Sequence, residues 1–302
     1  MKNKILNFIK QPLWLVVYLN NRGFHFFNDK VYLKILFKLH FNKKLDFNNP
    51  KTINEKLQWL KLNDRNPLYS TLVDKSLVKD YVARIIGVEY IIPTIAVYNN
   101  VKDINFDSLP DKYVMKCTHD SGCICICNDK NDFDKVDALK KLKKSLNKNY
   151  YYYGREWPYK NVKPRIIIEK NMSELSSVDD YKFYCFNGKV HFVMIVTNRF
   201  SKEGPKADFF DDHFNYLDFT WGFEHCEERP KKPQNFDKMI KIAEKLSATI
   251  PHVRVDLYNL NSKIYFGEMT FYDSSGFEPI LPAEWDLKIG NMLNLDFSYK
   301  QK

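Results

Sequence analysis

Several features that would place this chain in a familiar class are missing from its sequence. The apolar run at residues 12–19 is far shorter than the ~20 residues that a helix needs to cross a bilayer, and no small-residue cleavage site follows it. No internal repeat or long low-complexity linker occurs, so any domain boundary must be tight. The basic residues form no aromatic-basic motif, and we therefore expect no nucleic-acid partner.

A secreted disulfide framework is also missing, although the chain has six cysteines. Three of them alternate as Cys123, Cys125 and Cys127, which predicts that they share one face of a strand. Zinc sites usually take cysteines in pairs from tight C-x-x-C turns, so we expect buried or half-buried thiols instead. A reducing cytoplasm suits such a protein best.

What the sequence does contain is enough apolar material for a large core. Its 302 residues are 44% hydrophobic and 16% aromatic, which allows one large domain or two closely joined ones. The net charge of +10 indicates anionic partners such as nucleotides, acidic sugars or anionic lipids. Residues 1–40 combine lysines with Trp14 and several phenylalanines, so a peripheral membrane contact at the inner face of the membrane is an alternative to a purely packing role.

The pattern along the chain predicts mixed α and β structure. Thr52 and Glu55 have the spacing of a capping box and predict a helix start. Asp74 is expected to cap a second helix that ends at Gly87, and a short strand at residues 88–98 is interrupted by Pro93. The remaining expected elements are a hairpin at 113–127, a helix from Asp134, a strand at 165–170, a hairpin at 180–197 around Asn187-Gly188, and a helix at 236–246.

Residues 253–272 predict a further hairpin, which carries the acidic residues Asp256 and Glu268. Whether the two carboxylates meet depends on the turn at residues 259–262. An odd loop of three or five residues would place Asp256 opposite Phe266 and make Glu268 its diagonal neighbour at roughly 7 Å. A hard divalent cation could then sit between them. The alternative from patterning alone is a solvated hairpin with outward-pointing charges.

Seven short motifs, taken in order, carry a resemblance to a known family. They are residues 54–61 (NEKLQWLK), 74–75 (DK), 119–122 (HDSG), 155–160 (REWPYK), 180–182 (DYK), 254–256 (RVD) and 266–271 (FGEMTF). Together they resemble the TupA-like ATP-grasp family, from about residue 28 to about 293. The family is associated with teichuronopeptide and other surface-polysaccharide biosynthesis. The resemblance implies an α+β ATP-grasp fold, in which two α+β subdomains hold ATP between them after a mainly helical N-terminal region.

The resemblance also implies roles for individual residues. Phosphate contacts would come from Lys116 and Lys182 and from the loop that contains His119, Ser121 and Gly122, and His119 would also be a candidate acid/base. Glu169 and Lys170 would touch adenine. Asp256 and Glu268 would bind Mg²⁺, with Thr270 where many ATP-grasp enzymes have asparagine. Arg254 would stabilise the transferring phosphoryl group, and Arg199 would orient an acidic substrate.

The function that follows is an ATP-dependent carboxylate–amine ligase. Its partners would be ATP, a carboxylate-bearing sugar or glycan precursor, and an amine. The expected units are an N-terminal segment at 1–50, a helical region at 51–111, a small subdomain at 112–172 and a large one at 173–302. Two alternatives stay open: a glycosyltransferase that uses Asp132-Phe133-Asp134, although Asp134 also reads as a helix cap, and a non-enzymatic protein that binds membranes or polyanions through residues 1–45.

Overall fold

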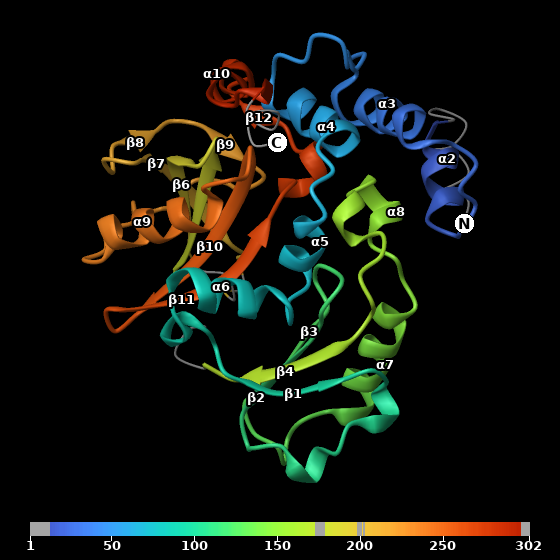
Figure 1. Ribbon diagram of the computed structural model, residues 1–302, viewed down its shortest axis with the longest axis vertical. Coiled ribbons are helices and arrows are strands. Elements are labelled where there is room, and N and C mark those ends of the chain that lie inside the picture. The colour runs from blue at the N-terminus through green and yellow to red at the C-terminus, as the bar shows by residue number, and fades with distance from the viewer. Residues whose placement is uncertain (1–12, 173–178, 198–200, 202, 297–302) are drawn as a thin grey trace.

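The computed structural model describes residues 13–172, 179–197, 201 and 203–296, and it consists of two antiparallel sheets with helices around them (Figure 1). The helices are α2 (Leu13–Asn20), α3 (Asp29–Phe41), α4 (Ile53–Asn63), α5 (Leu68–Val73), α6 (Val78–Ile86), α7 (Lys135–Leu146), α8 (Tyr151–Gly154), α9 (Phe236–Ser247) and α10 (Glu284–Met292). The mixed α+β class predicted from the sequence is confirmed.

The smaller sheet has the strand order β1-β4-β2-β3. Its strands are β1 (Thr94–Tyr98), β2 (Tyr113–Cys117), β3 (Ile124–Cys127) and β4 (Ile166–Lys170). Alternate residues of β2 are fully buried against α7, and the intervening residues Val114 and Lys116 face the other way. This alternation gives the small sheet one apolar face for its own core and one face that is free to line a site.

The larger sheet has the order β11-β10-β5-β6-β7-β8, with a separate two-stranded pair formed by β9 and β12. Its strands are β5 (Asp180–Phe186), β6 (Lys189–Thr197), β7 (Lys206–Asp211), β8 (Tyr216–Leu217), β10 (His252–Leu260) and β11 (Lys263–Thr270), and the pair is β9 (Thr220–Trp221) with β12 (Ile280–Leu281). Helix α9 packs on β5, β6 and β10. The large core contains residues of this helix and of the sheet, together with residues of other helices.

The cores cross the expected unit boundaries. Helices α4, α5 and α6 contribute to the same core as the large sheet, whereas β1, from the same expected region at 51–111, pairs with β4 of the small sheet. A third cluster joins α3 to Phe277. The segment before the small subdomain is thus shared between both sheets.

The motif at residues 155–160 fastens the N-terminal helices to the rest of the protein. Arg155 is 2% exposed, lies 4.3 Å from the centre of the Tyr32 ring and donates a 2.8 Å hydrogen bond to Asn20. Glu156 is buried beside Ser275 and the ammonium group of Lys61. Burial lowers the pKa of Lys61, and the nearby Glu156 carboxylate opposes that shift only in part.

Most local predictions hold, with two corrections. The capping box of Thr52 and Glu55 is present at the start of α4. Asp74 accepts hydrogen bonds from the amides of Ser76 and Leu77, so it closes a turn before α6 instead of capping the helix itself. The expected strand at 88–98 was partly wrong, because Val88–Tyr90 is a 3₁₀ helix and β1 begins only after Pro93.

Candidate functional site

The hairpin β10–β11 brings the two predicted metal-binding acids together. Leu260 pairs with Lys263, so the loop contains only Asn261 and Ser262, both with positive φ. A two-residue loop of this kind matches the twist of the strands. The loop is therefore even, and the pairing of Asp256 with Phe266 that an odd loop would give does not occur.

A β-bulge brings the two acids opposite each other in spite of the even loop. The regular register would place Asp256 opposite Gly267, but the register shifts by one residue and Asp256 pairs directly with Glu268. Gly267 is the extra residue, and a Cβ there would lie 3.1 Å from both the Asp256 carbonyl oxygen and the Tyr258 ring. The two acids thus share one face of the sheet by way of the bulge.

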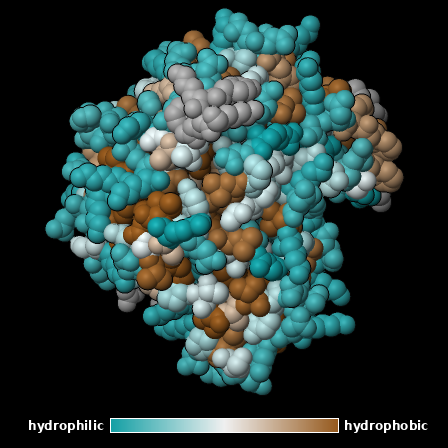
Figure 2. Space-filling model, in the orientation of Figure 1, coloured by the Kyte–Doolittle hydropathy of each residue, from teal (hydrophilic) through white to brown (hydrophobic). Residues whose placement is uncertain are grey.

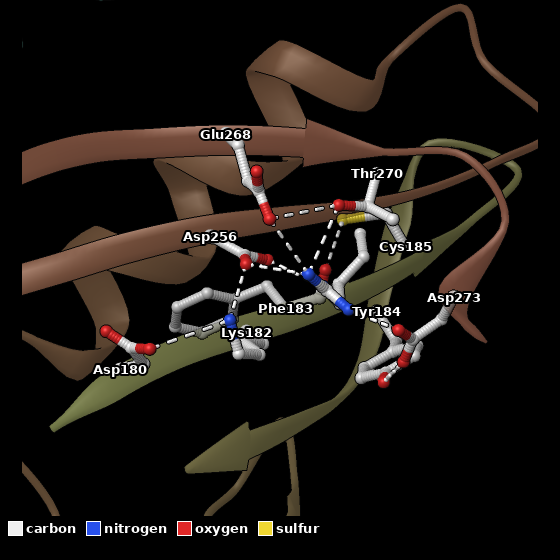
Figure 3. Close-up of polar contacts among 10 residues, drawn as sticks. Asp180, Lys182, Phe183, Tyr184, Cys185, Asp256, Glu268, Thr270 and Asp273 are labelled. Atoms are coloured by element: carbon white, nitrogen blue, oxygen red, sulfur yellow. Dashed lines mark hydrogen bonds and ion pairs between the residues drawn. The ribbon is translucent and has the colours of Figure 1, made fainter. Parts of the chain in front are cut away.

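Asp256 sits in a dense ionic network with Arg254 and Lys182 (Figure 3). The Arg254 guanidinium donates to both carboxylate oxygens of Asp256, at 2.7 and 2.8 Å, and Lys182 Nζ lies 2.6 Å from Oδ2. Arg254 also donates to Glu268 at 3.2 Å, to Thr270 Oγ1 at 3.1 Å and to Asp273. All three guanidinium nitrogens of Arg254 therefore have protein acceptors.

The charges in this network set the protonation of Asp256. Burial alone would raise the pKa of its carboxyl, but Arg254 and Lys182 hold that pKa below its ordinary value. The same burial would lower the pKa of Arg254, and Asp256 and Asp273 keep it well above the ordinary value. Asp256 is consequently an anion at neutral pH. The Glu268 side chain is much more exposed than that of Asp256, at 46% of its surface.

A second charge cluster lies on the small sheet. Glu169 of β4 is 6% exposed and pairs with Lys116 of β2 at 2.7 Å and with Lys79 of α6. Burial would raise the pKa of Glu169, but the two ammonium groups hold it below its ordinary value. Lys170, the next residue, is exposed, and its amide donates to the Pro93 carbonyl. Glu169, Lys116 and Lys79 together carry a net charge of +1.

The loop between β2 and β3 contains the residues that were predicted to cover phosphates. Gly122 has φ +89°, and a Cβ there would meet no atom within 4 Å, so its backbone faces open space. The ring of His119 is buried, and its Nε2 lies 3.2 Å from the carbonyl oxygens of Ser145, in the last turn of α7, and Lys148, just after that helix. Burial lowers the pKa of His119. The imidazole thus fastens the loop to α7.

A cavity of about 470 Å³ lies between the two sheets and collects these groups. Its charged lining residues are Lys75, Lys79, Lys116, Lys170, Lys182, Glu169, Asp180, Asp256 and Glu268. Its apolar lining includes Ile92, Val114, Ile124 and Phe266, and Ser121 and Gly122 form part of the wall. A cavity of this size, with apolar walls and convergent charges, suits a nucleotide-sized ligand.

The cavity brings together most of the predicted site residues, from both sheets. Lys116, Ser121, Gly122, Glu169, Lys170, Lys182, Asp256 and Glu268 all line it. Among the described residues, Arg254, Thr270 and His119 do not line the cavity. Arg254 and Thr270 bond to the lining residues Asp256 and Glu268, and the His119 ring contacts the carbonyls of Ser145 and Lys148. Arg199 lies outside the described residues.

Sequence reasoning missed two lysines of the cavity. Lys79 lies in α6 beside the apolar residue Val78, and nothing in the sequence links it to Glu169, ninety positions further along the chain. Lys75 belongs to one of the seven motifs but received no role, and its ammonium group donates to the Asp120 carbonyl in the loop that follows β2. Only the tertiary structure shows that both lysines line the same cavity as the residues predicted to contact phosphate.

Comparisons with known proteins give weak likenesses among solved structures. D-alanine–D-alanine ligase from Bacillus anthracis is 17% identical with a TM-score of 0.45, over 78% of this chain and 72% of that one. D-cycloserine synthetase DcsG is 13% identical with a TM-score of 0.41, over 78% and 72%. D-Alanine-D-Alanine Ligase from Helicobacter pylori is 15% identical with a TM-score of 0.39, over 82% and 66%. Curated proteins give no match.

The comparison with protein families is decisive, because its match covers most of the chain. The model described as TupA-like ATPgrasp matches residues 55–294. This range contains both sheets, the cavity between them and every described residue of the charge clusters. The resemblance found in the seven motifs is thereby confirmed, and the chain belongs to the TupA-like ATP-grasp family.

Proposed function

We propose that this protein, an ATP-dependent ligase by its family, joins a carboxylate to an amine through an acyl phosphate. The carboxylate would belong to a uronic acid or a similar acidic unit of a surface polysaccharide or its precursor. The observation that carries the proposal is the pairing of Asp256 with Glu268 on one face of the large sheet, in a cavity that Lys116 also lines from the small sheet.

The acidic pair fits a magnesium ion that would accompany ATP. Both ligands are hard carboxylate oxygens, which Mg²⁺ prefers, and Asp256 is kept ionised by its cationic neighbours. The ion would supply charge neutralisation at the phosphate oxygens. Thr270 lies behind the pair and donates to Glu268 at 3.4 Å, so we assign it the orientation of that carboxylate.

The cationic side chains of the site have two different roles, phosphate contact and positioning of the acidic pair. Lys116 and Lys182 line the cavity, and their ammonium groups suit contacts with phosphate oxygens. Arg254 has protein acceptors at all three nitrogens, so we propose a positioning role: it holds Asp256 and Glu268 in place instead of contacting the transferring phosphoryl group.

The reaction then needs no nucleophilic side chain. A substrate carboxylate oxygen attacks the γ-phosphorus of ATP, the bond to the β-phosphate oxygen breaks, and ADP leaves. The amine nitrogen attacks the acyl carbon, the C–O bond to phosphate breaks, and the nitrogen loses a proton. The products are an amide, ADP and inorganic phosphate. Positioning and charge neutralisation by the lysines carry the first step.

The test is ADP release by the purified protein with Mg²⁺-ATP and a panel of uronic acids, each with and without amines. Hydroxylamine as the amine would trap the acyl phosphate as a hydroxamate, which identifies the activated carboxylate. We expect Asp256→Asn and Glu268→Gln to lose both signals. Asp211→Asn, which changes a carboxylate of β7 that does not line the cavity, serves as the matched control. Absence of ADP release with every acid, together with unchanged ATP binding in both variants, would overturn the proposal.

A peripheral contact with the inner face of the membrane is a compatible second proposal. Phe26 and Phe24 after α2 are 71% and 52% exposed, and Figure 2 shows apolar surface over α2 at the upper right. Within the described residues, every helix is too short or too polar to span a bilayer. We expect the protein to float with anionic liposomes and Phe24→Ser/Phe26→Ser to reduce flotation. Val88→Ser, at another exposed apolar position, is the control.

The glycosyltransferase alternative has no comparable support. Asp134 caps α7 by accepting a hydrogen bond from the Asp137 amide, as the sequence indicated. Neither Asp132 nor Asp134 lines the cavity. Transfer of a sugar from a nucleotide-sugar donor that Asp132→Ala abolishes, and Asp256→Asn does not, would reverse this preference.

A further inference from the structure

Two cysteines face each other at the base of the loop that lines the cavity. The last pair between β2 and β3 is Lys116 with Ile124, so one step further Cys117 lies opposite Cys123. Both are free thiols. Their sulfur atoms and an Asp120 carboxylate oxygen all lie within 4.8 Å of one another. Residues 118–122 between them form the loop that contributes Ser121 and Gly122 to the cavity wall.

The two thiols have different surroundings, which gives them different chemistry. Cys123 is half-buried and lines the cavity, so small solutes can reach it, whereas Cys117 is fully buried. A hydrogen bond from Cys117, opposed by burial and supported by the charge of Lys75, lowers the pKa of Cys123 to about 6. The same hydrogen bond and burial raise the pKa of Cys117. Cys123 is therefore the thiolate of the pair and the better nucleophile.

We propose that Cys123 is a redox-modification site whose oxidation by a peroxide ends in a Cys117–Cys123 disulfide and weakens ATP binding. The Cys123 thiolate attacks one peroxide oxygen, the O–O bond breaks, and the second oxygen leaves as water after it takes up a proton. The Cys117 thiol then attacks the sulfenic sulfur of Cys123, an S–S bond forms, and the sulfenic oxygen leaves as a second water. A dithiol reductant reverses the change by thiol–disulfide exchange.

The geometry links this bond to the nucleotide. A disulfide needs its sulfur atoms about 2.05 Å apart at a fixed dihedral angle, so its formation changes the side-chain positions at both ends of the loop and ties those ends together. Ser121 and Gly122, which line the cavity, lie between those ends. This part of the proposal rests on the proposed function, in which the loop covers ATP phosphates. Because linkage is reciprocal, ATP that prefers the reduced loop must also favour the reduced thiols.

The experiment begins with the affinity of the fully reduced protein for ATP in the presence of Mg²⁺, and the titration is repeated after treatment with hydrogen peroxide. We expect peptide mass analysis to show Cys117 linked to Cys123 with the loss of two hydrogen atoms. We also expect ATP affinity to fall on the order of tenfold, within the usual range of coupling between sites. Dithiothreitol should restore the affinity, and bound ATP should slow the oxidation.

Cys123→Ser should bind ATP and keep its affinity after peroxide treatment. Cys226→Ser is the matched control, because Cys226 is the other half-buried thiol and lies outside the cavity, and this variant should respond as the wild type does. A missing linkage, an unchanged affinity once the linkage has formed, or stoichiometric zinc in the purified protein would each overturn the proposal. Failure of the reduced protein to bind ATP would instead count against the proposed function, since the disulfide is mapped without nucleotide.

Discussion

Asp256 and Glu268 share one predicted role as metal ligands. Their surroundings predict that substitution lowers the stability of the free protein much more at Asp256 than at Glu268. Asp256 accepts two hydrogen bonds from Arg254 and one from Lys182 while it is 4% exposed. Asp256→Asn removes an anionic partner of Arg254, which is buried, and of Lys182. Loss of one partner of a buried ion pair costs roughly 3–5 kcal/mol of unfolding free energy. The amide still offers one acceptor oxygen, so we expect about 3 kcal/mol, the lower end of that range.

Glu268→Gln should leave the fold almost intact. Its side chain is 46% exposed and accepts from Arg254 at 3.2 Å, and exposed ion pairs contribute about 0–1 kcal/mol. Urea unfolding without nucleotide measures both costs, and calorimetric titration with ATP at varied Mg²⁺ concentration measures the shared role. We expect both variants to lose the Mg²⁺ dependence of ATP binding.

The pH dependence of unfolding provides an internal check. The folded-state pKa of Asp256 is depressed, so its contribution to stability is present above the unfolded-state pKa and is lost as pH falls through the folded-state value. The difference between wild type and Asp256→Asn should therefore shrink below about pH 4. Equal stability of the two proteins at neutral pH would refute the buried-pair argument, and a normal Mg²⁺ response in Glu268→Gln would refute its role as a ligand.

Three further predictions concern the cavity walls. Lys116→Met should weaken ATP binding by about 1.5–3 kcal/mol, the usual worth of a hydrogen bond to a charged group, whereas Lys141→Met on the exposed face of α7 should leave titrations with ATP unchanged. Glu169→Gln should reduce stability at neutral pH, and because the pKa of Glu169 is depressed, its denaturation curve should approach that of the wild type below about pH 4.5. Gly267→Ala should cost about 1–3 kcal/mol in thermal unfolding by overpacking against the Asp256 backbone and the Tyr258 ring, and a cost near zero would contradict the tight bulge.

Local signals in the sequence were reliable where neighbouring residues alone decide the structure. The capping box at Thr52 and the Asn187-Gly188 turn both occur as predicted, the turn with φ of 52° and 79° at its two residues. Each signal depends on backbone groups only a few positions apart. The alternation of Cys123, Cys125 and Cys127 likewise predicted half-buried and buried thiols correctly.

Contacts between distant segments could not be predicted in this way. Lys79 reaches Glu169 only because α6 packs close to the edge of the small sheet, and no periodicity in either segment encodes that approach. The resemblance implied that Arg254 would stabilise the transferring phosphoryl group, and no local pattern shows which acceptors its guanidinium contacts. Its position allows the guanidinium to fold back onto Asp256 and Asp273, since two nearby carboxylates offset the desolvation of a buried cation.

The hairpin of Asp256 and Glu268 shows how two departures from a regular strand can cancel. Strand periodicity fixes which residues share a face, and a two-residue loop alone would have sent the acids to opposite faces. The extra residue Gly267 restores the match, and glycine suits the position because the Asp256 carbonyl and the Tyr258 ring leave little room for a Cβ. Phe266 meanwhile stays opposite Leu257 in the core. The bulge therefore reconciles a tightly packed strand with an acidic pair that faces the cavity, and the glycine in residues 266–271 is a structural requirement of the site itself.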